Sequence, residues 1–209
     1  MVALAWMLAH VSPPARAEGA WGSSMAAELV RQGQEHARNG DEAVATRRFA
    51  DAIQLDPTYG PAYLELAAAR ERSGDLFEAE RTYDVAIRNV PDFGAAFRAR
   101  AALLHRLGDS EREVSDLEAA VRLTDAPDLL RDLAERYVED RAWPAALATW
   151  RKILAATERR SDDGLAHEAT IQIRALVILC GELDPVSGGA SSRNWVRRSE
   201  ASVAKRRGM

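Results

Sequence analysis

Hydrophobic residues recur along most of the chain with the three- to four-residue spacing of amphipathic helices, and helix-breaking residues separate the runs. Gly40, Gly74 and Gly108 recur every 34 residues, each followed by aspartate, and Pro57 and Pro91 keep the same period. Two breaks per period predict two helices per period, because glycine readily adopts the left-handed conformation that ends a helix and the following aspartate can cap the next one. A fixed period of this length indicates stacked repeats.

Between these breaks, the order of large and small residues resembles the tetratricopeptide repeat, whose first helix reads W-x2-L-G-x2-Y and whose second reads A-x3-F. The small residues of the first helices are Gly33, Ala67, Ala101 and Ala134. The large residues of the second helices are Phe49, Tyr83, Leu117 and Trp150. We expect the small residues where paired helices approach closest, and the large ones in the gap to the next unit. The resemblance covers roughly residues 26–160.

The resemblance implies an all-α fold, a right-handed α-solenoid of helix–turn–helix repeats. The predicted repeats are residues 26–59, 60–93, 94–126 and 127–160. The third lacks the closing proline, and the fourth has no glycine at its internal turn. A capping helix is expected within 161–184, because a terminal repeat needs a cover for its apolar face, and 185–209 is predicted to be a flexible basic tail.

The first residues have the order of a targeting segment. Residues 2–11 are apolar apart from one histidine, a Ser-Pro-Pro run follows, and Ala15-Arg16-Ala17 is a small-x-small cleavage site. We therefore expect a signal peptide over 1–17, a mature N-terminal segment over 18–25, and a periplasmic or secreted protein. The alternative is a cytoplasmic protein with a partly apolar N-terminus. The run is too short to cross a bilayer, which takes about 20 apolar residues.

Composition and charge narrow the function classes. The sequence is 47% hydrophobic, enough for a core, and its formal net charge of −4 is spread over stretches of mixed sign, which argues against nucleic-acid binding. The single cysteine, Cys180, excludes a disulfide within one chain and any multi-cysteine metal site. It lies in an apolar run, where we expect it to be an inert core residue.

No catalytic, cofactor-binding or metal-binding pattern is present. The four histidines are scattered without a ligand at metal-binding spacing, and there is neither a phosphate-binding glycine loop nor a nucleophile elbow. We therefore expect a protein that is not an enzyme and that uses no cofactor.

Tetratricopeptide-repeat proteins use their first helices to line a concave groove for a peptide or a partner's helix, and the resemblance implies the same here. The groove residues implied by the register are Gln34, Arg38, Leu64, Glu71, Arg72, Arg98, His105, Arg106, Arg131 and Glu135. We expect the arginines to be unpaired and to favour an acidic ligand. A solvated helix face with ion pairs such as Arg131 with Glu135 fits the same residues equally well. The Lys and Asn by which some members of the family clamp a chaperone's terminal carboxylate are absent, because Val30 and Gln34 stand there.

Two functions follow from these patterns. The first is a protein-interaction scaffold, an assembly or envelope-complex factor of the bacterial periplasm. The second is a peripheral membrane protein whose tail forms a short amphipathic helix on anionic lipid. The residues for this membrane contact are Arg193, Trp195, Arg197, Arg198, Lys205, Arg206 and Arg207.

Overall fold

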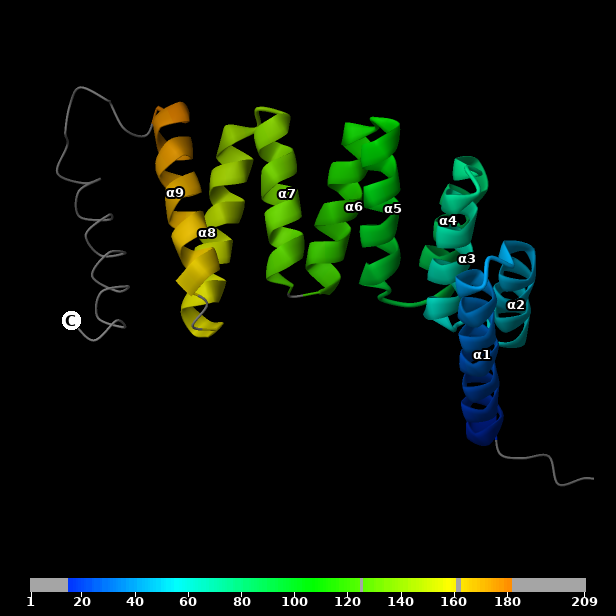
Figure 1. The fold of residues 1–209 in the computed structure, drawn as a ribbon. Helices are drawn as coiled ribbons and strands as arrows, with labels where there is room; N and C mark the ends of the chain where they lie inside the picture. The colour runs from blue at the N-terminus through cyan, green and yellow to red at the C-terminus, as the bar shows by residue number, and fades with distance from the viewer. Residues whose placement is uncertain (1–14, 125, 161–162, 182–209) are drawn as a thin grey trace, which may run out of the picture. The chain divides into compact units, whose positions relative to one another are not determined.

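A computed structural model of the chain describes residues 15–124, 126–160 and 163–181 (Figure 1). Within these ranges every regular element is an α-helix, which confirms the predicted all-α class. The chain divides between Leu103 and Leu104, inside one of the helices, into two compact units.

The helices alternate with short turns in both units. The first unit holds α1 (Ala15–Arg38), α2 (Glu42–Leu55), α3 (Gly60–Arg72), α4 (Leu76–Asn89) and most of α5 (Gly94–Leu107). The second holds the end of α5, α6 (Ser110–Leu123), α7 (Pro127–Glu139), α8 (Trp143–Arg160) and α9 (Asp163–Leu179). Each period predicted from the sequence therefore contains two helices, as expected from its two breaks.

The turn inside each repeat has a residue in the left-handed backbone conformation. Gly40, Gly74 and Gly108 have φ values of 88°, 83° and 76°, so the predicted left-handed glycines are confirmed. In the fourth repeat, where glycine is missing, Arg141 takes this conformation with φ 58°. A side chain makes this conformation costly, by about 1–2 kcal/mol for a residue other than glycine.

The residue after each left-handed position closes the turn through its backbone. The N–H of Asp41 donates to the carbonyl of His36 over 2.9 Å, and the N–H of Ala142 donates to that of Tyr137 over 2.8 Å. This is the Schellman arrangement, which satisfies the last carbonyls of the first helix. The predicted side-chain cap occurs only at Asp109, which accepts from the N–H of Arg112, and not at Asp41 or Asp75. The prediction of aspartate capping is therefore wrong for α2 and α4.

The small and large positions of the register are buried as predicted. A Cβ atom added to Gly33 would stand 2.4 Å from Cε1 of the Phe49 ring, which is fully buried. The small residues Ala67, Ala101 and Ala134 are buried, as are the large residues Tyr83, Leu117 and Trp150. In the first repeat, α1 and α2 thus touch at a small residue packed against a large one. Ala67 shares a buried cluster with Tyr83, and Ala134 shares one with Trp150.

In the second unit, α9 extends the core of the fourth repeat. It contributes Ala169, Ile173 and Leu176 to the cluster that holds Trp150 and Ile153 of α8. Cys180 packs against the edge of this cluster and is half-buried. The helix expected within 161–184 therefore lies on α8.

At the other end of the chain, α1 starts before the first predicted repeat. It begins at Ala15, so the predicted cleavage position after Ala17 and the segment 18–25 fall within it. Ser23 Oγ donates to Asp56 Oδ2 over 2.6 Å, which ties this part of α1 to the end of α2. Residues 1–14 and the tail after 181 lie outside the described residues, so the signal peptide stays a prediction.

The left-handed turn positions yield a matched pair of variants. Arg141→Gly should raise the free energy of unfolding by roughly 0.5–1 kcal/mol, because glycine removes the strain but adds entropy to the unfolded chain. Gly74→Ala should lower it by about 1 kcal/mol through conformation alone, since no atom lies within 4 Å of the added Cβ. Urea unfolding followed by circular dichroism measures both. A destabilising Arg141→Gly would contradict the role assigned to this turn.

Candidate ligand-binding groove

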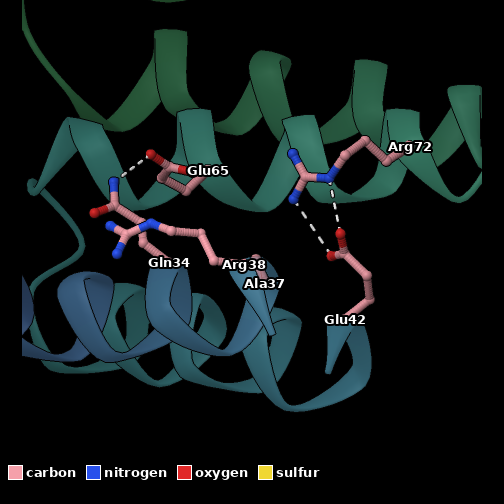
Figure 2. Close-up of a pocket in the computed structure, with 6 residues that line it drawn as sticks. All are labelled: Gln34, Ala37, Arg38, Glu42, Glu65 and Arg72. Atoms are coloured by element: carbon pink, nitrogen blue, oxygen red, sulfur yellow. Dashed lines mark hydrogen bonds and ion pairs between the residues drawn. The ribbon is translucent and has the colours of Figure 1, made fainter. Parts of the chain in front are cut away.

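An open pocket of about 450 Å³ lies between α1 and α3 in the first unit, with the start of α2 at one end (Figure 2). It is lined by Gln34, Ala37 and Arg38 of α1, Glu42 of α2, and Glu65 and Arg72 of α3. The structure therefore brings together three of the residues predicted to line a groove, Gln34, Arg38 and Arg72.

Two contacts between helices hold this pocket. Gln34 Nε2 donates to Glu65 Oε1 over 2.6 Å, joining α1 to α3. Arg72 Nε donates to Glu42 Oε1 over 2.9 Å and Arg72 Nη2 to Glu42 Oε2 over 3.3 Å, so α3 and α2 share a two-pronged ion pair. This hydrogen bonding raises the pKa of Arg72 above its ordinary value. Guanidinium and carboxylate planes match in this geometry, which fixes both side chains.

Arg38 differs from Arg72 because it has no hydrogen bond or ion pair with any residue that the structure describes. Its side chain is exposed, and it extends from α1 toward Gln34, away from the pair of Arg72 and Glu42 (Figure 2). A guanidinium carries five N–H donors and no acceptor. The guanidinium of Arg38 is therefore the cationic group of this pocket that can donate hydrogen bonds to a ligand.

The charge of the pocket differs from the sequence-based expectation. Two cations, Arg38 and Arg72, stand against two anions, Glu42 and Glu65. The expectation of an unpaired Arg72 is wrong, because the first turn of α2 brings Glu42 to it. Glu42 and Glu65 were missed, since the register assigned the groove to one face of the first helices alone. The acidic residue that opens α2, directly after Gly40-Asp41, was the available signal.

The other residues of the first unit that were predicted to line a groove do not line this pocket. Leu64 packs against the core cluster that contains Tyr83, and Glu71 accepts a hydrogen bond from the Tyr83 hydroxyl over 2.7 Å. Glu71 therefore contacts α4, and neither Leu64 nor Glu71 lines the pocket. Arg98 lies exposed on α5.

In the second unit, the predicted residues make local contacts. His105 Nδ1 lies 3.1 Å from Oε1 of the buried Glu113 on α6, and Arg136 Nη1 lies 3.7 Å from its Oε2. Arg131 and Glu135 form an ion pair of 3.9 Å along α7, which is the solvated arrangement that the sequence left open. Arg106 is exposed at the end of α5.

The described part of the chain contains no cluster of three or more His, Cys, Asp or Glu residues that could hold a metal ion. Among its helices, none has the length and apolar character needed to cross a membrane.

No protein-family model matches the sequence, and no curated protein matches it. Solved structures do resemble the chain. A tetratricopeptide repeat protein from Parabacteroides merdae aligns with a TM-score of 0.59 and 19% identity over 72% of this chain and 59% of its own. The chain thus spans less than two thirds of that protein's length.

Two further structures give the same comparison at lower identity. The MamA protein aligns with a TM-score of 0.53 and 15% identity over 75% of this chain and 90% of its own. A double mutant of MamA RS-1 aligns with a TM-score of 0.52 and 17% identity over 72% of this chain and 93% of its own. These alignments agree with the repeated helix pairs, their Schellman turns and their packing of small against large residues. The chain has the fold of tetratricopeptide-repeat proteins.

Proposed function

We propose that the chain is a non-enzymatic interaction scaffold that binds a partner peptide or helix in the pocket between α1 and α3. The observation that carries the proposal is the state of Arg38, a cationic donor without a partner among the described residues, in a pocket whose other cation is tied to Glu42. A carboxylate on the partner would complete the hydrogen bonding of this guanidinium. The ligand is therefore expected to carry an acidic residue.

The side chains next to Arg38 determine which other groups the partner needs in order to fit the pocket. Ala37 is small and lets a chain approach α1 closely, while the contact of Gln34 with Glu65 leaves the Gln34 carbonyl and the second Glu65 oxygen as acceptors. These acceptors suit backbone N–H groups or a basic side chain. A segment with a carboxylate beside such donors therefore fits the pocket better than a uniformly acidic one.

The proposed place of action is the bacterial periplasm, in the assembly or maintenance of an envelope complex. The support is the apolar run over 2–11 followed by the small-x-small motif ending at Ala17. The alternative, a peripheral membrane protein anchored by its basic tail, concerns residues outside the described ranges.

Ligand binding can be tested with peptides displayed from a random library and selected on the full chain at low salt. Selected peptides should contain Asp or Glu, bind more weakly as salt rises, and lose about tenfold or more in affinity with Arg38→Glu, since a hydrogen bond to a charged group is worth about 1.5–3 kcal/mol. Arg47→Glu is the matched control, because Arg47 is exposed on α2 and does not line the pocket. Peptides without acidic residues that bind the Arg38→Glu chain unchanged would place the interface elsewhere.

Export can be tested by N-terminal sequencing of the protein purified from its native host. Cleavage after Ala17 should leave Glu18 as the first residue. Recovery of the intact chain from the cytosol would refute this part of the proposal without touching the pocket.

A further inference from the structure

One of the two arginines in the pocket between α1 and α3 is occupied by a carboxylate of the chain itself. Arg72 donates to both carboxylate oxygens of Glu42, over 2.9 Å and 3.3 Å, and the two side chains remain 47% and 43% exposed. The pKa of Arg72 is raised, chiefly by these hydrogen bonds, and the negative charge of Glu65 adds to the rise. Arg72 therefore lines the pocket without being available to a ligand while Glu42 holds it.

The repeat itself does not require an acidic residue at the place of Glu42. Glu42 opens α2, and the residues that open α4 and α6 at the same period are Leu76 and Ser110. Arginine, by contrast, ends the first helix of both of the first two repeats, at Arg38 and Arg72. The two arginines thus follow the repeat pattern, whereas the carboxylate that pairs with one of them is a feature of the first repeat.

The charged side chains divide the pocket into two ends (Figure 2). Arg38 lies at one end with Gln34 and Glu65, and Arg72 lies at the other end with Glu42. Gln34 donates to one oxygen of Glu65 over 2.6 Å, so the other oxygen of Glu65 can accept from a donor of the ligand. While Glu42 stays on Arg72, the charged groups left for a ligand are thus one guanidinium and one carboxylate.

A ligand with two adjacent anionic groups must compete with Glu42. Its first anion can pair with Arg38, but its second must take Arg72 from Glu42. Glu42 is tethered at hydrogen-bonding distance, which gives it an effective concentration on the order of millimolar or more, and its place in the first turn of α2 favours its negative charge. A displaced Glu42 would also face the second anion of the ligand, and such like-charge contacts select against a partner.

We propose that Glu42 determines the specificity of this pocket, an inference that rests on the function proposed above. By holding Arg72, Glu42 admits a segment with one carboxylate beside an amine or another donor, and it excludes a segment with two adjacent anionic groups. Phosphorylation of the partner beside its carboxylate would therefore weaken binding, because a phosphate adds about 1.5 to 2 negative charges at neutral pH.

Two acetylated and amidated tetrapeptides test this specificity by NMR on the full chain labelled with heavy nitrogen. Gly-Asp-Lys-Gly carries one carboxylate and one ammonium group, and Gly-Asp-Asp-Gly carries two carboxylates. The Nε–H signals of Arg38 and Arg72 report which guanidinium each peptide contacts. In the unmodified chain, the Asp-Lys peptide should shift the Arg38 signal and bind about fivefold more tightly than the Asp-Asp peptide, and neither should shift the Arg72 signal.

Glu42→Gln should reverse this preference, because it removes the competing charge and keeps the size of the side chain. The Asp-Asp peptide should bind this variant about tenfold more tightly than the unmodified chain and shift the Arg72 signal, and adding Arg72→Gln should cancel the gain. Glu42→Ser, which copies the residue that opens α6, should act in the same way. Glu28→Gln is the matched control, since it removes the same charge from an ion pair with Arg31 that lies outside the pocket.

Three outcomes would overturn this role of Glu42. The Asp-Asp peptide could bind Glu42→Gln and the unmodified chain equally while the Asp-Lys peptide still shifts the Arg38 signal, which would leave the proposed function intact. An equal gain in Glu28→Gln would show that net charge alone sets the preference. If neither peptide shifts the Arg38 signal in any chain, the proposed function fails and the specificity fails with it.

Discussion

The contact of a small residue in one helix with a large residue in the next sets the geometry of the repeats. In the first repeat, Gly33 leaves room for the ring of Phe49, and a single Cβ atom would stand 2.4 Å from that ring. Because interiors are packed to nearly crystalline density, neither partner can grow without moving a helix. The second and fourth repeats have alanine at this position, and the fully buried Ala67 and Ala134 share clusters with Tyr83 and Trp150 respectively.

The candidate groove depends on this contact. Gln34 follows Gly33 directly, and Ala37 and Arg38 lie one turn further along α1. The depth at which Phe49 seats against Gly33 therefore decides how the polar side of α1 faces α3, where Glu65 and Arg72 meet it. The hydrogen bond of Gln34 to Glu65 joins α1 to α3 in this arrangement, and the ion pair of Arg72 with Glu42 joins α3 to α2. A structural interlock at Gly33 thus positions a polar site beside it on α1.

Much of the fold could be predicted from the sequence because the turns are local. The left-handed glycines and the periodic small residues act within a few positions of themselves, so spacing alone located the helix pairs. Arg141 escaped prediction, since nothing in its residue type signals a left-handed conformation. The ion pair of Arg72 with Glu42 was not predicted either, because these residues lie 30 positions apart and meet only once α2 and α3 are packed. Leu64 and Glu71 were assigned to the groove by register, yet Leu64 packs against a core cluster and Glu71 accepts a hydrogen bond from Tyr83 of α4.

The most direct measurement of the central claim is a double-mutant cycle on Gly33 and Phe49, with the free energy of unfolding as the readout. Gly33→Ala alone should destabilise the chain by about 1–3 kcal/mol through overpacking, although alanine is the better helix former. Phe49→Leu removes the ring atoms that the new Cβ would meet, so in the double variant about 1 kcal/mol or more of the summed loss should be recovered. Strictly additive losses, or a Gly33→Ala chain as stable as the original, would contradict the interlock.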